Sequence, residues 1–493
     1  MSRTVAIVGA GIGGLAAAAL LAKAGHRVTV FEQAAQAGGK AASVDLGGYR
    51  FDTGPSLFTL PDVFRAFFER LGRDLGDFLE LVPLTPLCAY EFADGTRLNS
   101  YSDRARFAVE LEAVGVASAA ELDAYLERSA RLWEWAGELF LTRSLHEPAT
   151  YASRRGLKAL LNAARLSPFA NLHAANARAF ADPRAGQLFD RYATYNGSSP
   201  FRTPATMRII PHGEYAFGGY ALKGGIVALP RALERAAREL GVEFRFGARV
   251  ERIVVENGRC RGIEAGGAFF PSDFVVSNAD VLSTYRTLLG QPNASEARRY
   301  ARLEPSSSGL VFLWGVKQRF PRLQVHNIFF SGDYRAEFEA IFGALDMPAD
   351  PTIYVNVTSK VDPGDAPPGG ENWFVLLNAP RHAGQDWPAA AARARQAVLK
   401  RLSRALGCDV GALIAEERII APPDIERDTG STCGSLYGIA SHSPVSAFLR
   451  HPNRSRRIGG LYFAGGSAHP GGGMPLALLS GILAADLAEK YES

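Results

Sequence analysis

The sequence predicts an α/β protein with a Rossmann-like dinucleotide-binding domain that is discontinuous in the chain. An inserted α+β domain and a largely helical region are expected between its parts. Three observations lead to this prediction. The first forty residues alternate strand, glycine-rich turn, helix and strand, and residues 460–490 contain another strand, glycine turn and helix. The chain of 493 residues is also long enough for two or three domains.

Composition excludes several classes of protein. The chain is 47% hydrophobic and 21% charged, with a net charge of +4, which does not favour nucleic acid as a partner. No run of about 20 apolar residues and no signal peptide are recognised, so no transmembrane helix is expected. The four cysteines are far apart and the nine histidines lack metal-binding spacing. We therefore expect reduced thiols, no metal and a cytoplasmic protein.

The N-terminal motif has the order that a dinucleotide-binding unit requires. Residues 4–8 are predicted to form a buried parallel strand, residues 15–23 a helix and residues 27–31 a second strand. Gly9 permits the tight turn after the first strand, and Gly11 lets the backbone approach a pyrophosphate. The free N–H groups at the helix N-terminus then face the phosphates.

Two further features complete this fingerprint. Gly14 lets the helix pack closely on the strand, and Glu32 follows the second strand, where it can accept hydrogen bonds from ribose hydroxyls. An acid at this position disfavours a ribose 2′-phosphate, so NADP is not expected. The predicted cofactor-binding residues of the motif are Gly9, Gly11, Gly13, Gly14 and Glu32.

The segment after Glu32 distinguishes between dinucleotides. Gly38-Gly39-Lys40 is followed by a glycine, aromatic, aspartate, glycine and proline segment at residues 48–55. This pattern resembles the phytoene desaturase and amine oxidase superfamily of flavoproteins. The resemblance implies FAD, with the backbone around Gly39 and Lys40 along the ribityl and phosphate portion. A lysine there favours phosphate, and Gly54 and Pro55 are added to the expected FAD site.

The C-terminal motif is similar to the part of this superfamily that returns to close the FAD site. A strand at residues 460–464 enters a glycine turn, and a helix is expected over residues 476–490 with Pro475 in its first turn. The helix N-terminus can then point at the flavin ring. The resemblance implies binding by Gly465, Gly466, Gly473 and Met474. His469 is a candidate for a role at the ring or for a capping histidine.

The middle of the chain resembles the carotenoid desaturase branch of the superfamily. Residues 191–206 match its motif, and residues 218–225 match a glycine- and aromatic-rich hairpin that follows it. Residues 242–246 read as a third strand of the FAD domain, and the resemblance implies that the backbone of Val250 meets the adenine. Asn257-Gly258 is a strong turn signal between two further strands.

These motifs divide the chain into three regions. We expect an FAD-binding domain from residues 1–75, 225–290 and 430–493, and a substrate domain from residues 76–104 and 291–429. The substrate domain contains strand-like runs at residues 310–316, 328–330, 352–358 and 373–378. Residues 105–224 are expected to be a helical lid or membrane-associating region.

The resemblance implies that the chain is an FAD-dependent carotenoid desaturase. Its expected substrates include carotenoid end groups and hydroxylated carotenoids. Oxidised flavin takes one hydrogen as hydride, and a base or water takes the other as a proton. Glu214, His212 and His469 are the catalytic candidates. An apolar polyene requires a long apolar tunnel, whose candidate walls are Tyr195, Phe201, Tyr215, Phe217 and Tyr220. The expected electron acceptor is oxygen or a membrane quinone.

The sequence also fits two other functions and a contact with a membrane. A flavin amine oxidase, or another polyene or retinoid redox enzyme, has the same fold. Prenyl-protein chaperones of the Rab escort type also share it, but they generally lack the complete FAD motifs. Residues 151–178 combine apolar and basic residues, which fits either an amphipathic helix on the inner face of a membrane or a lid packed on the core.

Overall fold

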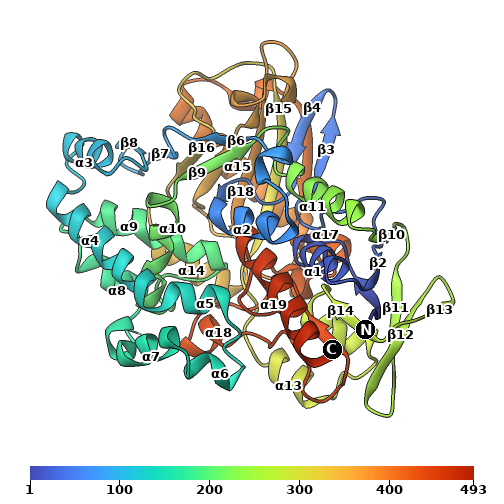
Figure 1. The fold of residues 1–493 in the computed structure, drawn as a ribbon. Coiled ribbons are helices and arrows are strands. Elements are labelled where there is room, and N and C mark those ends of the chain that lie inside the picture. Colours follow the sequence, from blue (N-terminus) through green and yellow to red (C-terminus); the bar gives the residue numbers. More distant parts are fainter. Residues whose placement is uncertain (168, 493) are drawn as a thin grey trace.

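The structure, a computed structural model, describes residues 1–167 and 169–492. It is an α/β fold, in which one of the sheets is parallel and five-stranded (Figure 1). The strand order is β10-β2-β1-β14-β20, and every neighbouring pair is parallel. These strands are β1 (Thr4–Val8), β2 (Arg27–Phe31), β10 (Glu243–Arg245), β14 (Phe274–Ser277) and β20 (Leu461–Phe463).

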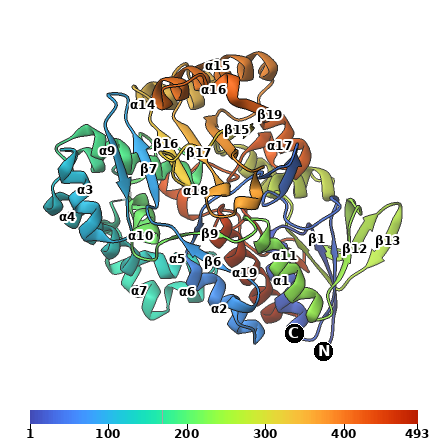
Figure 2. The same ribbon diagram turned by 90° about the horizontal axis from the view of Figure 1, so that it is seen from above.

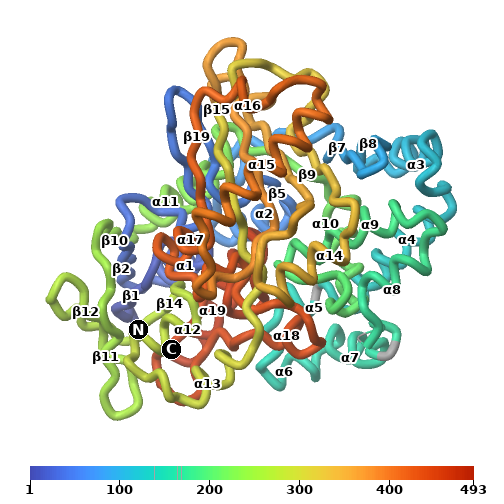
Figure 3. Tube along the Cα trace, turned by 180° about the vertical axis from the view of Figure 1, so that it is seen from behind, coloured from blue at the N-terminus to red at the C-terminus, as the bar shows by residue number. Residues whose placement is uncertain are grey.

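Three helices pack beside this sheet, and two of them come from opposite ends of the chain. Helix α1 (Ile12–Lys23) packs against α11 (Ala228–Glu239) and against α19 (Met474–Glu492). At the crossing of α1 and α19, a Cβ atom built on Gly481 would lie 2.1 Å from the carbonyl oxygen of Gly13. The two helices therefore meet backbone to backbone, and the chain termini lie side by side (Figures 1 and 3).

The predicted turn at Asn257-Gly258 is confirmed. Strands β11 (Val250–Glu256) and β12 (Arg259–Ala265) pair antiparallel on either side of it, and β13 (Ala268–Pro271) adds a third strand. Asn257 has a φ of 50° and Gly258 a φ of 74°. Both residue types tolerate this left-handed region, which a two-residue hairpin loop needs.

The second large sheet is mixed and has seven strands in the order β19-β15-β18-β17-β16-β7-β8. Only β16 and β7 pair in parallel. The four strand-like runs between residues 310 and 378 are confirmed here. Helix α15 (Trp387–Leu406) packs on the face formed by β15, β17 and β18 (Figure 2). The strands are β7 (Cys88–Glu91), β8 (Arg97–Ser100), β15 (Ser308–Val316), β16 (His326–Phe329), β17 (Ile353–Asn356), β18 (Glu371–Ala379) and β19 (Ile414–Ile420).

Most of the helices of the N-terminal half gather on one side of the molecule (Figure 1). They are α3 (Arg104–Ala113), α4 (Ala119–Leu132), α5 (Glu138–Thr142), α6 (Pro148–Tyr151), α7 (Arg154–Leu161), α8 (Leu172–Ala177), α9 (Pro183–Asp190) and α10 (Ile210–Tyr215). Residues 151–178 are not one continuous helix, because the chain turns between α6, α7 and α8. Leu172, at the start of α8, is buried in the core rather than exposed on an amphipathic face. Residue 168 of this segment lies outside the described residues.

One expected hairpin is wrong. Residues 218–225 do not fold back on themselves, because β9 (Gly219–Leu222) pairs with β5 (Phe58–Thr59) on one side and β6 (Leu81–Pro83) on the other. The strand is held by partners far away in sequence, so no local turn signal could indicate them. Shorter elements complete the fold: β3 (Ser43–Leu46), β4 (Tyr49–Asp52), α2 (Pro61–Leu71), α12 (Val281–Ser283), α13 (Ser295–Ala301), α14 (Tyr334–Glu339), α16 (Val410–Leu413), α17 (Pro422–Thr429) and α18 (Pro444–Phe448).

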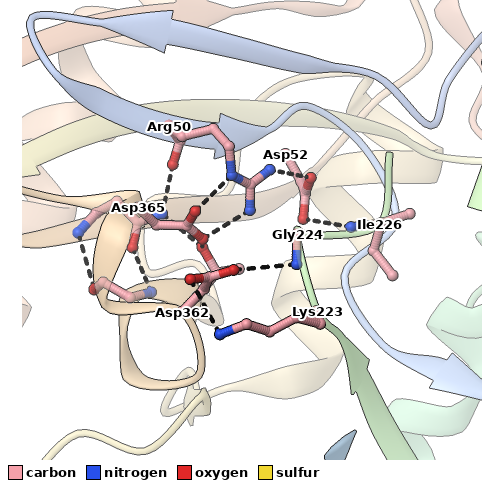
Figure 4. A network of polar contacts seen from close by, with 10 residues as sticks. Arg50, Asp52, Lys223, Gly224, Ile226, Asp362 and Asp365 are labelled. Carbon is pink, nitrogen blue, oxygen red and sulfur yellow. Dashed lines mark hydrogen bonds and ion pairs between the residues drawn. The ribbon is translucent and has the colours of Figure 1, made fainter. Parts of the chain in front are cut away.

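A buried ionic network ties three distant segments together (Figure 4). Arg50 on β4 donates to both carboxylate oxygens of Asp365, at 2.6 and 2.7 Å, and to Asp52 at 2.9 Å. Asp52 also accepts from the backbone N–H of Ile226, just before α11, at 3.0 Å. Burial alone lowers the pKa of Arg50, but its hydrogen bonds and the charges of the two carboxylates outweigh this and raise the pKa.

None of the helices within the described ranges is both long enough and apolar enough to span a bilayer. In the same residues, His, Cys, Asp and Glu side chains form no group of three that could hold a metal ion.

Candidate functional site

A cavity of about 1200 Å³ extends from the glycine-rich turns into the region between the two large sheets. The glycine turns of both chain ends line it, together with residues of the seven-stranded sheet and of the helical region. Of the residues predicted to bind the cofactor, those that line this cavity are Gly9, Gly11, Gly13, Glu32, Gly39, Lys40, Gly54, Pro55, Val250, Gly465, Gly466, Gly473 and Met474.

The first glycine turn presents an open helix N-terminus to the cavity. Gly11 is the N-cap residue of α1, and it provides no side-chain hydrogen bond to the free N–H groups of the first turn. Gly9, with a φ of 94°, makes the turn that follows β1. Gly14 does not line the cavity; a Cβ on it would lie 2.2 Å from the carbonyl oxygen of Gly9, so this glycine permits the close contact of helix and strand. An uncapped N-terminus of this kind binds phosphate groups.

Glu32 stands at the end of β2 and is only 8% exposed. Its Oε2 accepts a hydrogen bond from the backbone N–H of Ala10 at 2.7 Å, and its Oε1 accepts one from Ala34 at 2.8 Å. These bonds fix the carboxylate at the cavity wall. A carboxylate has further lone pairs, so it can still accept hydrogen bonds from hydroxyl groups of a ligand.

Lys40 connects the two ends of the chain. Its Nζ donates to the backbone carbonyls of Ser435 at 3.0 Å and Leu436 at 2.8 Å. Burial lowers its pKa to about 8, although the negative charge of Asp280 acts in the opposite direction. Two of the three donors of the ammonium are used within the protein. The Lys40 ammonium therefore has one donor left for the phosphate contact that the sequence predicts.

The C-terminal turn faces the first one across the cavity. Gly465 and Gly473 have φ values of 91° and 105°, a backbone conformation that glycine adopts without strain. Met474 begins α19, whose first turn also lines the cavity. A Cβ on Gly13 would lie 2.7 Å from the backbone nitrogen of Gly465, which shows how closely the two turns approach.

Asn278 is a further residue of the site, which the sequence analysis did not predict. It follows β14 at the carboxyl end of the parallel sheet and lines the cavity. Its Oδ1 is buried and has no hydrogen-bond partner among the described residues. Ligands of open α/β sheets bind at this edge. The position of Asn278 directly after a buried strand could therefore have indicated a site residue.

The residues predicted around the substrate separate into two groups. Tyr195 and Glu214 line the cavity. The structure does not bring Phe201, Tyr215, Phe217 or Tyr220 to it. Tyr215 stacks on Phe107 in the core of the helical region, and Tyr220 packs against the core of the parallel sheet. Phe201 lies beside His173 and Arg335, and Phe217 lies beside Trp133 and His212.

The two histidine candidates do not line the cavity either. His212 contacts the rings of Trp133 and Phe217, which also contact each other, and burial lowers its pKa. His469 is completely buried, its Nε2 donates to the carbonyl oxygen of Arg143 at 2.9 Å, and burial lowers its pKa to about 4. This bond ties the C-terminal turn to the end of α5.

The inner part of the cavity contains polar residues that sequence reasoning missed. Arg191 donates to Glu214 Oε1 at 3.0 Å and to the hydroxyl of Tyr192 at 3.0 Å. Tyr195 donates to Glu214 Oε2 at 2.5 Å. Ser56, His326 and Tyr354 also line the cavity. They come from three separate segments, so their proximity follows only from the fold.

Comparison with known proteins supports one family. The model of the flavin containing amine oxidoreductases matches residues 12–488. The 1-hydroxycarotenoid 3,4-desaturase of Flavobacterium sp. (strain P99-3) is 44% identical, over 98% of this chain and 98% of its own length. The chain belongs to the carotenoid desaturase family of flavin-containing amine oxidoreductases.

One further relative agrees with this assignment, and a solved structure shows the same fold. The hydroxyneurosporene desaturase of Rubrivivax gelatinosus is 34% identical over 98% of this chain and 92% of its own length. An oxidoreductase of Methanosarcina mazei shares the fold, with a TM-score of 0.65 at 17% identity, covering 99% of this chain and 100% of its own. The predicted family, the FAD cofactor and the oxidoreductase activity are confirmed, whereas the amine oxidase and chaperone alternatives are not favoured.

The residues present in this carotenoid desaturase family member fit FAD. The open N-terminus of α1, the glycines that leave room for a pyrophosphate, the Glu32 carboxylate and the unpaired Asn278 Oδ1 all belong to one continuous cavity. Side chains at Gly11 and Gly13 would fill part of this space, because a Cβ at either position would meet Asn278 within 2.8 Å.

Proposed function

We propose that this chain desaturates a hydroxylated carotenoid next to its hydroxylated end. The observation that carries the proposal is a single cavity lined at one end by the glycine turns predicted to bind FAD and farther in by both apolar walls and buried polar groups. The names of the two relatives described above both combine a hydroxylated carotenoid with desaturation. When bound, FAD supplies the hydride acceptor, and O2 or a membrane quinone is proposed to reoxidise it.

We assign the proton-accepting role to Glu214. It is the only one of the three predicted candidates that lines the cavity. Its Oε2 accepts one hydrogen bond, from Tyr195, and therefore keeps a lone pair for a proton. Tyr192, Tyr195 and Arg191 hold the carboxylate in place. Apolar residues of the seven-stranded sheet, Val311, Ile328, Phe374 and Leu376, exclude water and align the hydrocarbon.

The test is an absorbance measurement on the purified holoenzyme under anaerobic conditions. The flavin bands of the wild-type protein should bleach when a hydroxylated carotenoid is added in detergent or liposomes, and the carotenoid spectrum should shift to longer wavelength as conjugation grows. In the same assay E214Q should bind the carotenoid but bleach at least about 100-fold more slowly. Flavin bands that persist with every carotenoid would exclude the proposed reaction.

The same proposal assigns a separate function to each of three regions of the chain. Residues 1–75, 225–290 and 430–493 provide the FAD-binding part, residues 76–104 and 291–429 the substrate-binding part, and residues 105–224 a helical lid. The strands of the parallel sheet come from the first set, and those of the seven-stranded sheet come from the second, which supports this division.

We also propose that the lid rests on the inner face of a membrane, from which the substrate enters. Leu157, Leu160 and Leu161 of α7 are 52%, 54% and 84% exposed, and Phe169 is 96% exposed. Arg154 on the same helix can contact anionic headgroups. Helix α7 packs against α5, and α5 residues line the cavity, so a lipid bound at α7 would lie near the cavity.

The membrane contact predicts that vesicle binding weakens when exposed apolar side chains of the lid are replaced by charged ones. The double variant Leu161→Glu and Phe169→Glu should bind anionic vesicles at least about 10-fold more weakly, because two apolar side chains no longer enter the bilayer. Co-flotation with vesicles measures this. Phe269→Glu is the matched control, because Phe269 is 50% exposed on β13, in a different part of the fold. Equal flotation of all three proteins would contradict the proposed contact.

A further inference from the structure

The inner wall of the cavity contains more polar groups than a hydrocarbon requires. Ser56, Arg191, His326 and Tyr354 line it beside apolar residues. Arg191 is 6% exposed and His326 is 3% exposed. Buried polar groups are costly unless they are hydrogen-bonded, and a polyene chain offers them no partner. Ser56 and Tyr354 bond each other and Arg191 bonds Glu214, but Nε2 of His326 has no partner among the described residues, which indicates that part of the ligand is polar.

His326 has a defined tautomer in this wall. Its Nδ1 lies 2.6 Å from the hydroxyl of Tyr354 and 3.2 Å from Nδ2 of Asn356. The same Asn356 Nδ2 donates to the carbonyl oxygen of Val325 at 3.0 Å, which fixes the amide as the donor. Nδ1 is therefore an acceptor. Burial and the nearby positive charge of Arg191 together lower the pKa of His326 to about 3, so the ring is neutral with its proton on Nε2.

The Nε2–H group of His326 is left without a partner. It is buried and makes no hydrogen bond to any described residue. A histidine of the protein core would ordinarily use both ring nitrogens, and leaving a buried donor unpaired costs stability. Because the side chain also lines the cavity, a ligand oxygen is the group that would complete its hydrogen bonds.

We propose that His326 determines specificity by donating its Nε2–H to the hydroxyl oxygen of the carotenoid end group. This inference rests on the proposed function. Tyr354 is the positioning residue, because its hydroxyl bonds His326 Nδ1 and lies 2.5 Å from Ser56 Oγ. Ser56 directly follows Gly54 and Pro55 of the FAD site. A hydroxyl group held here would keep the neighbouring carbon atoms close to the reacting centre.

The test compares two carotenoids that differ only in the hydroxyl group, 1-hydroxylycopene and lycopene, on the detergent-solubilised holoenzyme. Dissociation constants come from quenching of flavin fluorescence, and KM and kcat come from turnover. The wild-type protein should bind the hydroxylated carotenoid about 10–100-fold more tightly. His326→Phe should reduce this ratio to about 1, mainly through KM, and His326→Gln, which retains an N–H donor, should restore part of it.

Three further measurements separate recognition from general disturbance of the cavity. Phe374→Leu alters an apolar wall and should weaken both carotenoids equally, while Tyr354→Phe should give an intermediate ratio. The wild-type ratio should stay constant between about pH 5 and 8, because His326 remains neutral over that range.

The results for the hydroxyl preference and for the reaction are distinguishable. A ratio near 1 in the wild-type protein, or a ratio unchanged by His326→Phe, would overturn the role of His326 even if the flavin bleaches normally. A preference that His326→Phe abolishes, observed without any bleaching, would support His326 as the hydroxyl-binding residue and exclude the proposed desaturation instead.

Discussion

Replacing Arg50 by methionine should lower the free energy of unfolding by about 3–5 kcal/mol. The change removes the cation between two carboxylates whose side chains, in Asp52 and Asp365, are 4% and 5% exposed. Both would remain buried without a counter-charge, and the link between β4, the turn before α11 and the loop at residues 362–365 would be lost. Urea unfolding of the holoenzyme measures the change.

The loss should depend on pH. Burial already raises the pKa of Asp52 in the folded protein, and removal of Arg50 raises it further. The folded state then binds more protons than the unfolded state above pH ~4, so the stability of the variant falls as the pH rises from there. The deficit should be larger at pH 7 than at pH 5. Arg65→Met, which removes an exposed ion pair with Asp62, should cost less than about 1 kcal/mol. Equal losses in both variants would contradict the role of the network.

Replacing Gly481 by alanine should destabilise the protein by about 1–3 kcal/mol and reduce its FAD content. The new Cβ would lie 2.1 Å from the carbonyl oxygen of Gly13 and 2.9 Å from Cβ of Ala16, so α19 must move away from α1. Because Gly13 and the first turn of α19 both line the cavity, this movement alters the FAD site. The ratio of flavin to protein absorbance and the urea midpoint report the two effects.

Gly186→Ala is the matched control for this substitution. Gly186 also lies within a helix, α9, but a Cβ there would meet no atom within 4 Å. Alanine should therefore raise stability by about 0.5–1 kcal/mol and leave the flavin content unchanged. If both alanine variants changed stability in the same direction, the close packing of α1 on α19 would not be the cause.

The sequence predicted most accurately the features whose signals are local. The strands, glycine turns and helices at the two chain ends carry their patterns within about ten residues, and the structure confirms them as β1, α1, β2, β20 and α19. The four apolar runs of the seven-stranded sheet were also found, because buried strands are continuously hydrophobic. Strands β7, β8 and β19 were missed. Strands β8 and β19 alternate short polar and apolar stretches, and β7 and β19 pair with the distant strands β16 and β15.

The site was predicted unevenly for the same reason. Glycines of the cofactor turns have fixed spacing, so they could be identified from the sequence. The inner wall has no such spacing: it is formed by Ser56, Arg191, His326 and Tyr354, which come from four separate segments. Pairing of β16 with β17 brings His326 near Tyr354, and the rest of the fold adds the other two. The aromatic walls of the substrate tunnel were predicted from residue type alone. Most of these residues pack against the core instead, because large aromatic side chains stabilise any hydrophobic interior.

The neighbouring positions of α1 and α19 have a consequence for biosynthesis. The parallel sheet remains without its edge strand β20, and α1 without α19, until residues 461–492 have left the ribosome. Contacts of such high sequence separation form slowly, and the apolar face of α1 stays open to wrong partners in the meantime. FAD can thus be captured in a completed site only after β20 and α19 have been synthesised, and the supply of the cofactor at that moment influences how much chain matures and how much aggregates.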